Sequence, residues 1–261
     1  MAKKIRVDQA LVERGLANSL DDAKRLVMAG KVRSRDQLVM NASQIIENLL
    51  DITLSRESEF VSRGGEKLQA AFNHFPINVK DSVCADIGSS TGGFTDCLLK
   101  NGAKLVYAID VGYGILDWRL RNDERVVVLE RTNARTMAGL PEPINFFSVD
   151  VSFISLNMIL PTAAKFYGPE GGEAVVLVKP QFEATREEAA QGAGVIEDPI
   201  VHQRILTEVL GDAEKNGYQV KGLIKSPLLG PEGNVEFLAW LVYPHQKDFQ
   251  HMAEGLITSL F

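Results

Sequence analysis

The stretch Asp86–Asp96, which reads DIGSSTGGFTD, decides the fold of this 261-residue chain. It follows the apolar run Val83–Asp86 and leads into a helical segment, so the chain must turn tightly here. Gly88, Gly92 and Gly93 let the backbone of such a turn approach a ligand closely. The stretch therefore predicts a site for a nucleotide-like cofactor between a strand and a helix.

The identity of that cofactor depends on the glycine spacing and on the neighbouring acids. The order is Gly-x-x-x-Gly-Gly rather than Gly-x-Gly-x-x-Gly, and the preceding strand ends on Asp86. The next strand ends on Asp110, where a carboxylate can accept hydrogen bonds from ribose hydroxyls. These features favour S-adenosylmethionine. A nicotinamide dehydrogenase and a strand-to-helix turn without a ligand remain the alternatives.

Short apolar runs alternate with helical segments after the turn, which is typical of a mostly parallel sheet with helices on both faces. The sequence predicts an α/β class protein with a Rossmann-like, seven-stranded sheet and a long helix at Ile200–Asn216. Because ligands of such sheets bind beyond the carboxyl ends of the strands, Asp86, Asp110, Asp150 and Lys179 should converge. The predicted strands are Val83–Asp86, Leu105–Asp110, Val126–Glu130, Ile144–Val149, Ala174–Lys179, Tyr218–Lys225 and Val235–Tyr243.

The amino-terminal segment predicts a separate, small α+β module. Apolar residues recur at helical spacing between Arg6 and Gly30, with a break at Gly15–Ser19, so two helices are expected. Ser19 is the predicted N-cap of the second helix and Gly30 its end. Three short strands should follow, at Lys31–Ser34, Leu38–Met40 and Asp51–Leu54.

Charge is distributed unevenly along the chain. The formal net charge is −6, yet residues 1–35 hold nine Lys or Arg against four acidic residues. A basic module at one end is typical of a surface that contacts phosphates. The candidate RNA-binding residues are Arg6, Arg14, Lys24, Arg25, Lys31 and Arg33.

Several classes of protein are disfavoured by composition. Two cysteines, Cys84 and Cys97, are too few for a disulfide framework, and the four histidines lack metal-ligand spacing. No apolar run approaches the roughly 18 residues that cross a bilayer, and no secretory signal is recognisable. We therefore expect a cytoplasmic protein without a metal, in which Ala184–Pro199 forms either a lid or an ordinary surface loop.

Lys179 is the candidate proton acceptor. Methyl transfer to a ribose hydroxyl needs in-line positioning and a group that removes the hydroxyl proton. Lys179 stands at a strand end before Pro180, and Asp150 and Glu236 could orient it. A solvated lysine and a turn aspartate are the alternative interpretations of Lys179 and Asp150.

Seven stretches in order resemble the TlyA family of ribosomal RNA methyltransferases, over nearly the whole chain. They are VSRGGEKL (Val61–Leu68), DIGSSTGGFTD, DVGYG (Asp110–Gly114), LRNDERVVVLERTNAR (Leu120–Arg135), DVSFISL (Asp150–Leu156), LVKPQFE (Leu177–Glu183) and GNVEFLAW (Gly233–Trp240). The resemblance implies an FtsJ-like class I methyltransferase domain preceded by an S4-like RNA-binding domain. One departure is RSRDQLV in place of the more usual Asn-Gly hairpin of the S4-like module, which weakens the assignment of Arg33 and Arg35.

The resemblance also implies the site residues and the reaction. A Lys-Asp-Lys-Glu tetrad for 2′-O-methylation of ribose falls on Lys67, Asp150, Lys179 and Glu236, where Lys67 tunes the site and holds the ribose. The implied substrate is a cytidine of 23S ribosomal RNA alone or of both subunits. The implied cofactor-binding residues are Asp86, Gly88, Ser89, Gly92, Gly93, Phe94, Asp110 and Asn133.

Together these inferences predict an S4-like domain at 1–57, a linker at 58–62, the methyltransferase domain at 63–246 and a tail at 247–261. Phe182, beside Lys179, could stack on the target base or serve packing alone. A non-catalytic RNA-binding or ribosome-assembly protein is the alternative function. A pore-forming hemolysin, suggested by family names, is disfavoured because no membrane-spanning segment is present. The sequence does not predict the oligomeric state.

Overall fold

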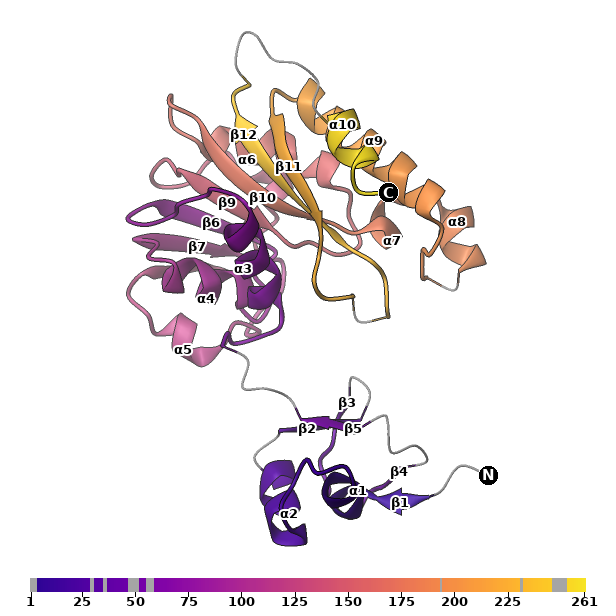
Figure 1. The fold of residues 1–261 in the computed structure, drawn as a ribbon. Helices are drawn as coiled ribbons and strands as arrows, with labels where there is room; N and C mark the ends of the chain where they lie inside the picture. Colours follow the sequence, from indigo (N-terminus) through magenta and orange to yellow (C-terminus); the bar gives the residue numbers. More distant parts are fainter. Residues whose placement is uncertain are drawn as a thin grey trace. The chain divides into compact units, whose positions relative to one another are not determined.

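The computed structural model describes residues 4–28, 31–34, 37–46, 52–54, 59–192, 194–230, 232–245 and 253–261. The chain divides into two compact units, Met1–Ser58 and Glu59–Phe261 (Figure 1). The second unit begins inside the stretch 58–62 that the sequence analysis assigns to a linker. The predicted domain boundaries stay a prediction.

The first unit contains the expected pair of helices, α1 (Val7–Glu13) and α2 (Leu20–Met28). The hydroxyl of Ser19 accepts a hydrogen bond from the backbone N–H of Asp22 at 3.1 Å, as expected of an N-cap. Gly30 and Arg35 lie outside the described residues. The core of this unit combines the apolar faces of the two helices, which include Val7, Leu11, Ala23 and Val27, with apolar residues of the strands and loops.

Short strands complete the first unit. β2 (Val32–Ser34) pairs antiparallel with β3 (Gln37–Leu38) and with β5 (Ile52–Leu54), close to the predicted positions. β1 (Ile5–Arg6) also pairs with β4 (Ile45–Ile46), which the sequence analysis does not predict. Strands of two residues are too short to show a two-residue periodicity.

The second unit is built on the predicted seven-stranded sheet, in the order β11-β12-β10-β9-β6-β7-β8. Strand β12 is antiparallel to both of its neighbours, and the pairs among β10, β9, β6, β7 and β8 are parallel. The Rossmann-like fold class is therefore confirmed. The strands are β6 (Val83–Ile87), β7 (Leu105–Ile109), β8 (Val126–Leu129), β9 (Phe146–Val149), β10 (Gly172–Val178), β11 (Gln219–Lys225) and β12 (Phe237–Tyr243).

Helices cover both faces of this sheet (Figure 1). The longest is α9, whose bounds Pro199–Lys215 differ by one residue at each end from those expected. The helices are α3 (Gly64–His74), α4 (Gly93–Lys100), α5 (Trp118–Arg121), α6 (Leu160–Ala163), α7 (Pro180–Glu183), α8 (Arg186–Gln191), α9 and α10 (Ala253–Thr258), with 3₁₀ turns η2 (Ala134–Thr136), η3 (Leu156–Met158) and η4 (Ala164–Phe166).

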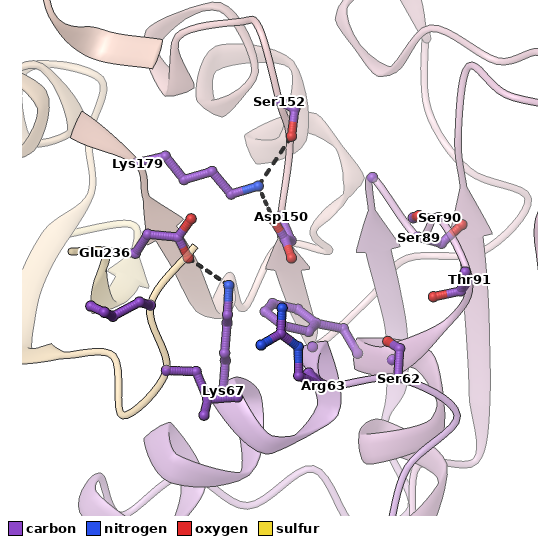
Figure 2. Close-up of a pocket in the computed structure, with 16 residues that line it drawn as sticks. Ser62, Arg63, Lys67, Ser89, Ser90, Thr91, Asp150, Ser152, Lys179 and Glu236 are labelled. Atoms are coloured by element: carbon purple, nitrogen blue, oxygen red, sulfur yellow. Dashed lines mark hydrogen bonds and ion pairs between the residues drawn. The ribbon is translucent and has the colours of Figure 1, made fainter. Parts of the chain in front are cut away.

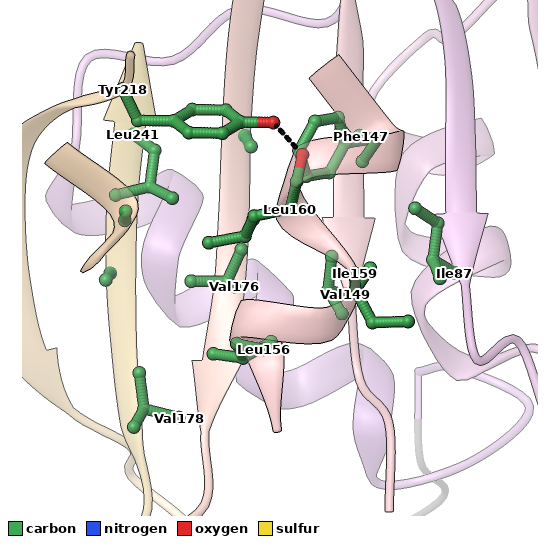
Figure 3. Packing of buried hydrophobic residues seen from close by; sticks show 14 of the residues in the cluster. Ile87, Phe147, Val149, Leu156, Ile159, Leu160, Val176, Val178, Tyr218 and Leu241 are labelled. Carbon is green, nitrogen blue, oxygen red and sulfur yellow. Dashed lines mark hydrogen bonds between the residues drawn. The ribbon is translucent and has the colours of Figure 1, made fainter. Parts of the chain in front are cut away.

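Alternation of side chains along the strands separates the core into two layers. Phe146 packs in the cluster that contains Leu68 of α3 and Leu98 of α4. Phe147, the next residue, packs in the cluster with Leu160 of α6 (Figure 3). Successive strand residues point to opposite faces, so one apolar run supplies both layers.

The two cysteines belong to the core of the second unit. Cys84 lies in β6 and Cys97 in α4, and both are buried in the same cluster. Burial raises the pKa of the Cys84 thiol to about 12, which leaves it without nucleophilic character near neutral pH.

The segment Ala184–Pro199, apart from Ala193, is anchored to the rest of the second unit. It contains α8, which begins with a capping box between Thr185 and Glu188. The side chain of Asn234 donates to the carbonyl of Gly194 at 3.0 Å and accepts from the N–H of Ile196 at 2.9 Å. These bonds favour the loop interpretation over the lid.

Candidate active site

The glycine turn between β6 and α4 has the geometry that its sequence requires. Gly88 has φ +84°, and a Cβ atom there would lie 2.4 Å from the backbone oxygen of Asp150. Gly92 has φ +96°, and its Cβ would lie 2.2 Å from a methyl group of Leu120. Both positions combine a left-handed conformation with a close approach, so only glycine fits without a rearrangement.

All four residues of the predicted tetrad line one cavity of about 290 Å³, which we call the tetrad cavity. Lys67 comes from α3, Asp150 and Lys179 directly follow β9 and β10, and Glu236 directly precedes β12 (Figure 2). The same cavity is lined by four of the predicted cofactor residues, Gly88, Ser89, Gly93 and Phe94. The fold thus brings together residues that lie far apart in sequence.

A second cavity of about 320 Å³, the strand-end cavity, lies beyond β6 and β7. Asp110 and Asn133 line it, as do Gly88 and Asp150, which it shares with the tetrad cavity. The Asp110 carboxylate is fixed by the backbone N–H groups of Ser90 at 2.8 Å and Gly112 at 2.7 Å. Each carboxylate oxygen keeps a further lone pair with which to accept from a ligand.

A third cavity, of about 400 Å³, is lined by Phe153 and Phe182, and we call it the aromatic cavity. The two ring centroids are 4.7 Å apart. Phe153 is 89% exposed and has φ +63°, which is an unusual conformation for a bulky residue. Lys179 and Glu236 also line this cavity, so it adjoins the tetrad cavity.

The tetrad is organised as two ion pairs. The Lys67 ammonium lies 2.5 Å from Glu236, whose side chain is 1% exposed. The Lys179 ammonium lies 2.5 Å from Asp150 and donates to the hydroxyl of Ser152 at 3.2 Å. Asp150 therefore contacts Lys179, and its role in orienting the lysine stays a prediction.

Glu236 does not have the expected partner. The sequence predicts that Glu236 orients Lys179, but its carboxylate is paired with Lys67. The second oxygen of its carboxylate accepts from the side-chain amide of Gln181 at 3.4 Å, while the first is paired with Lys67. A buried carboxylate is most favourable next to a buried cation, and α3 places Lys67 there. Glu236 thus holds Lys67.

Asp86 and Gly92 line none of the three cavities. The Asp86 carboxylate is fully buried beneath the turn and accepts from the hydroxyls of Thr95 at 2.7 Å and Ser148 at 3.2 Å. In this position Asp86 connects the first turn of α4 to strand β9. Its place in the structure is that of a support for the cofactor turn.

The buried Asp86 carboxyl gives the protein a specific pH dependence. Burial, assisted by the nearby Asp150, raises its pKa from 3.8 to about 7. Its contribution to stability is complete below pH 4 and is lost as the pH rises through 7, because the charged form is then buried. In an Asp86→Asn variant this pH-dependent loss should be absent. The difference in unfolding free energy between the variant and wild type should therefore change between pH 4 and pH 8, by about 4 kcal/mol at most.

Urea unfolding of both proteins between pH 4 and pH 8 measures this difference. Unfolding free energies that keep a constant separation over this range would contradict the assignment.

The candidate RNA-binding residues lie in the first unit, and several of them have protein partners. Arg6 pairs with Asp8 at 2.6 Å, and Arg14 donates to the carbonyl of Ile52. Lys24 pairs with Asp21 and Arg25 with Asp22, both across one helical turn. Lys31 directly precedes β2 and Arg33 lies within it, and both are half-buried. The Lys24 and Arg25 pairs are exposed and contribute little to stability, whereas Arg6 pairs with the buried Asp8. RNA binding by these residues stays a prediction.

Sequence reasoning missed several residues that line the tetrad cavity. Ser62, Arg63, Ser90, Thr91 and Ser152 belong to this group (Figure 2). Ser62 and Arg63 stand in the stretch that contains Lys67, and Ser152 follows Asp150 by two residues. Their position inside the quoted motifs is the signal that could have identified them.

The sheet order and the cavities beyond the carboxyl ends of its strands define a Rossmann-like α/β protein with a nucleotide-type cofactor site. Residues 60–243 match the family described as FtsJ-like methyltransferase, and the chain belongs to this family.

Similar proteins support this assignment over the whole chain. YqxC of Bacillus subtilis is 48% identical over 250 residues, which cover 93% of this chain and 87% of that protein. The 16S/23S rRNA (cytidine-2′-O)-methyltransferase TlyA of Mycobacterium tuberculosis is 44% identical over 260 residues, 98% of this chain and 96% of that protein. A solved hemolysin-named protein from Streptococcus thermophilus has 41% identity and a TM-score of 0.75, covering 99% of this chain and 96% of that one. The resemblance to the TlyA family is confirmed.

The described residues also bear on two other features, membrane-spanning helices and metal centres. None of the helices among these residues has both the length and the apolar character needed to cross a membrane. No group of three or more His, Cys, Asp or Glu side chains in the described part of the chain is arranged to hold a metal ion.

Proposed function

We propose that this chain is an S-adenosylmethionine-dependent methyltransferase that modifies the 2′-hydroxyl of a cytidine ribose in ribosomal RNA. The observation that carries the proposal is the tetrad cavity, in which Lys67, Asp150, Lys179 and Glu236 lie next to the glycine turn. The 44% identity to a protein named 16S/23S rRNA (cytidine-2′-O)-methyltransferase supports the choice of substrate.

The strand-end cavity fits the nucleoside part of this cofactor. Asp110 presents a carboxylate that can accept from two ribose hydroxyls, and Asn133 adds a polar side chain. Apolar side chains that suit an adenine ring complete the wall, among them Val111, Ile154 and Ile159. When bound, the cofactor supplies a methyl group activated by a positively charged sulfur.

Gly88, Ser89 and Gly93 then face the amino acid portion of the cofactor, because they line the tetrad cavity on the side of the glycine turn. Ser62, whose hydroxyl lies next to Gly93 of the turn, can donate a hydrogen bond to the carboxylate of that portion. The two cavities share Gly88 and Asp150, so these residues would lie beside the methyl group of a cofactor that occupies both cavities.

Lys179 is the group placed to accept the proton of the attacking hydroxyl. In the reaction a bond forms between the ribose oxygen and the methyl carbon as the bond from that carbon to sulfur breaks. The Lys179 ammonium first gives a proton to water. The resulting neutral amine then accepts the hydroxyl proton as the methyl group leaves the sulfur, which becomes uncharged. Asp150, 2.5 Å from the Lys179 nitrogen, holds the lysine in place during this step.

Lys67 gives the same cavity a second positive charge, which Glu236 fixes in position. A cation here can donate to a ribose or phosphate oxygen of the substrate and hold it in line. Arg63 also lines the cavity, beside Lys67, and adds a guanidinium group to its wall (Figure 2).

The aromatic cavity suits the base of the target nucleotide. Sequence-specific RNA recognition commonly stacks an unpaired base on aromatic side chains. Phe153 presents an exposed ring beside Phe182. Lys179 lines both this cavity and the tetrad cavity, which also contains residues of the glycine turn. A nucleotide with its base there would bring its ribose to Lys179.

The first unit is proposed to recruit the ribosomal subunit. Its predicted S4-like helix pair carries Arg6, Arg14, Lys24 and Arg25 at exposed positions, from which guanidinium and ammonium groups can reach phosphates. Since the substrate is ribosomal RNA, the proposed place of action is the cytoplasm.

Mapping of ribose methylation tests the proposed function. Ribosomal RNA from cells with and without the gene should differ by loss of 2′-O-methylation at one or more cytidines, and the purified protein should restore it. Equilibrium dialysis should show that the protein binds S-adenosylmethionine. Identical methylation maps, together with no cofactor binding, would refute the proposal, whereas binding of RNA alone would favour a non-catalytic role in ribosome assembly.

A further inference from the structure

The three cavities adjoin one another, and Ser152 lies where they meet. The strand-end cavity and the tetrad cavity share four residues, and the tetrad and aromatic cavities share three. Ser152 is the residue that belongs to all three. If the proposed function holds, the cofactor, the ribose and the base enter these cavities and meet beside its hydroxyl.

The Ser152 hydroxyl also contacts the proposed proton acceptor. It accepts a hydrogen bond from the Lys179 nitrogen at 3.2 Å, while Asp150 takes another at 2.5 Å (Figure 2). These two acceptors are side chains of the same loop, which lies between β9 and η3.

Two acceptors on one amine have a consequence for its lone pair. A neutral lysine amine has two N–H groups and one lone pair, arranged tetrahedrally around the nitrogen. With a single acceptor one N–H is held, and the lone pair can occupy either of the two remaining tetrahedral positions. With Asp150 and Ser152 each taking one N–H, the lone pair has one remaining direction.

We propose that Ser152 is a positioning residue that, together with Asp150, directs the lone pair of Lys179 toward the substrate hydroxyl. This inference rests on the proposed function, because it requires Lys179 to accept the proton. Ser152 itself takes no proton in the reaction. Its hydroxyl fixes the orientation of the group that does.

Single-turnover methyl transfer tests this role with three variants of the full chain. The substrate is ribosomal subunits from cells that lack the gene, and the cofactor carries a radiolabelled methyl group. Ser152→Ala should lower the single-turnover rate about 10-fold, because the orientation of the amine is lost. Ser152→Thr keeps a hydroxyl on the same atom and should recover at least half of the wild-type rate.

The matched control is Ser155→Ala, in the same loop. Ser155 caps η3 by accepting from the N–H of Asn157 and has no bond to Lys179 among the described contacts. This variant should retain the wild-type rate. In all variants the affinity for S-adenosylmethionine and the KM for subunits should stay within about twofold, since the proposed role affects only the chemical step.

The outcomes separate the two proposals. If the wild-type protein transfers no methyl group to ribose, the proposed function fails. If wild type is active and Ser152→Ala equals it, the positioning role is wrong. A rate lowered equally in the alanine and threonine variants, or in step with a loss of cofactor affinity, would likewise overturn it and assign Ser152 to the structure of the loop.

Discussion

Lys179→Ala is expected to lower the rate of methyl transfer to ribosomal RNA by about a thousandfold, with little change in cofactor affinity. A positioned general base contributes factors of this order, and alanine leaves no group that can accept the hydroxyl proton. The lysine contacts Asp150 and Ser152, whereas the strand-end cavity expected to hold most of the cofactor does not include it. The measurement is single-turnover transfer of a labelled methyl group, beside equilibrium dialysis of S-adenosylmethionine.

Lys225→Ala provides the matched control. Lys225 is also a strand-end lysine, the last residue of β11, but it lines none of the three cavities. This variant should transfer methyl groups at the wild-type rate. A Lys179→Ala protein that methylates ribosomal RNA nearly as fast as wild type would exclude Lys179 as the proton acceptor.

Removing Glu236 should have the largest effect on stability. In Glu236→Ala the Lys67 ammonium stays buried beside Leu68 and the turn but loses the carboxylate that lies 2.5 Å away. Breaking a buried pair by removing one partner costs about 3–5 kcal/mol, because a charge remains without compensation in a medium of low dielectric constant. Urea unfolding followed by circular dichroism measures this loss.

The double variant Lys67→Met/Glu236→Leu separates charge from packing. It removes both charges and keeps apolar volume, so most of the stability lost in Glu236→Ala should return while methyl transfer stays absent. A Glu236→Ala protein that unfolds at the wild-type urea concentration would show that the ion pair contributes nothing to the fold.

Much of the fold could be predicted because the decisive signals are local. Each strand of the large sheet appears in the sequence as an apolar run with a polar residue after it, as Asp110 follows β7 and Lys179 follows β10. The glycine turn could also be predicted, since Gly88 and Gly92 take conformations that other residues avoid. The two-residue strands β1 and β4 carry no such periodicity, and they were missed.

The sequence predicted which residues would lie together at the site better than it predicted which of them would form ion pairs. Strand ends predicted the approach of Asp150 and Lys179, but the partner of Glu236 depends on where α3 places Lys67, 169 residues earlier. Burial of Asp86 is likewise a tertiary property, because its neighbours Thr95 and Ser148 come from a helix and another strand. Such contacts between distant parts of the chain cannot be predicted from the spacing of residues in the sequence.

The reversed direction of β12 has a consequence for how the protein is made. Because β12 runs opposite to its neighbours, its first residues lie at the sheet edge where the other strands end, and Glu236 reaches the tetrad cavity from there. A ribosome that has synthesised the chain only as far as β11 has made Lys67, Asp150 and Lys179, but not the carboxylate that compensates Lys67. The nascent chain therefore completes the tetrad only when Glu236, the residue directly before the last strand of the sheet, has been added.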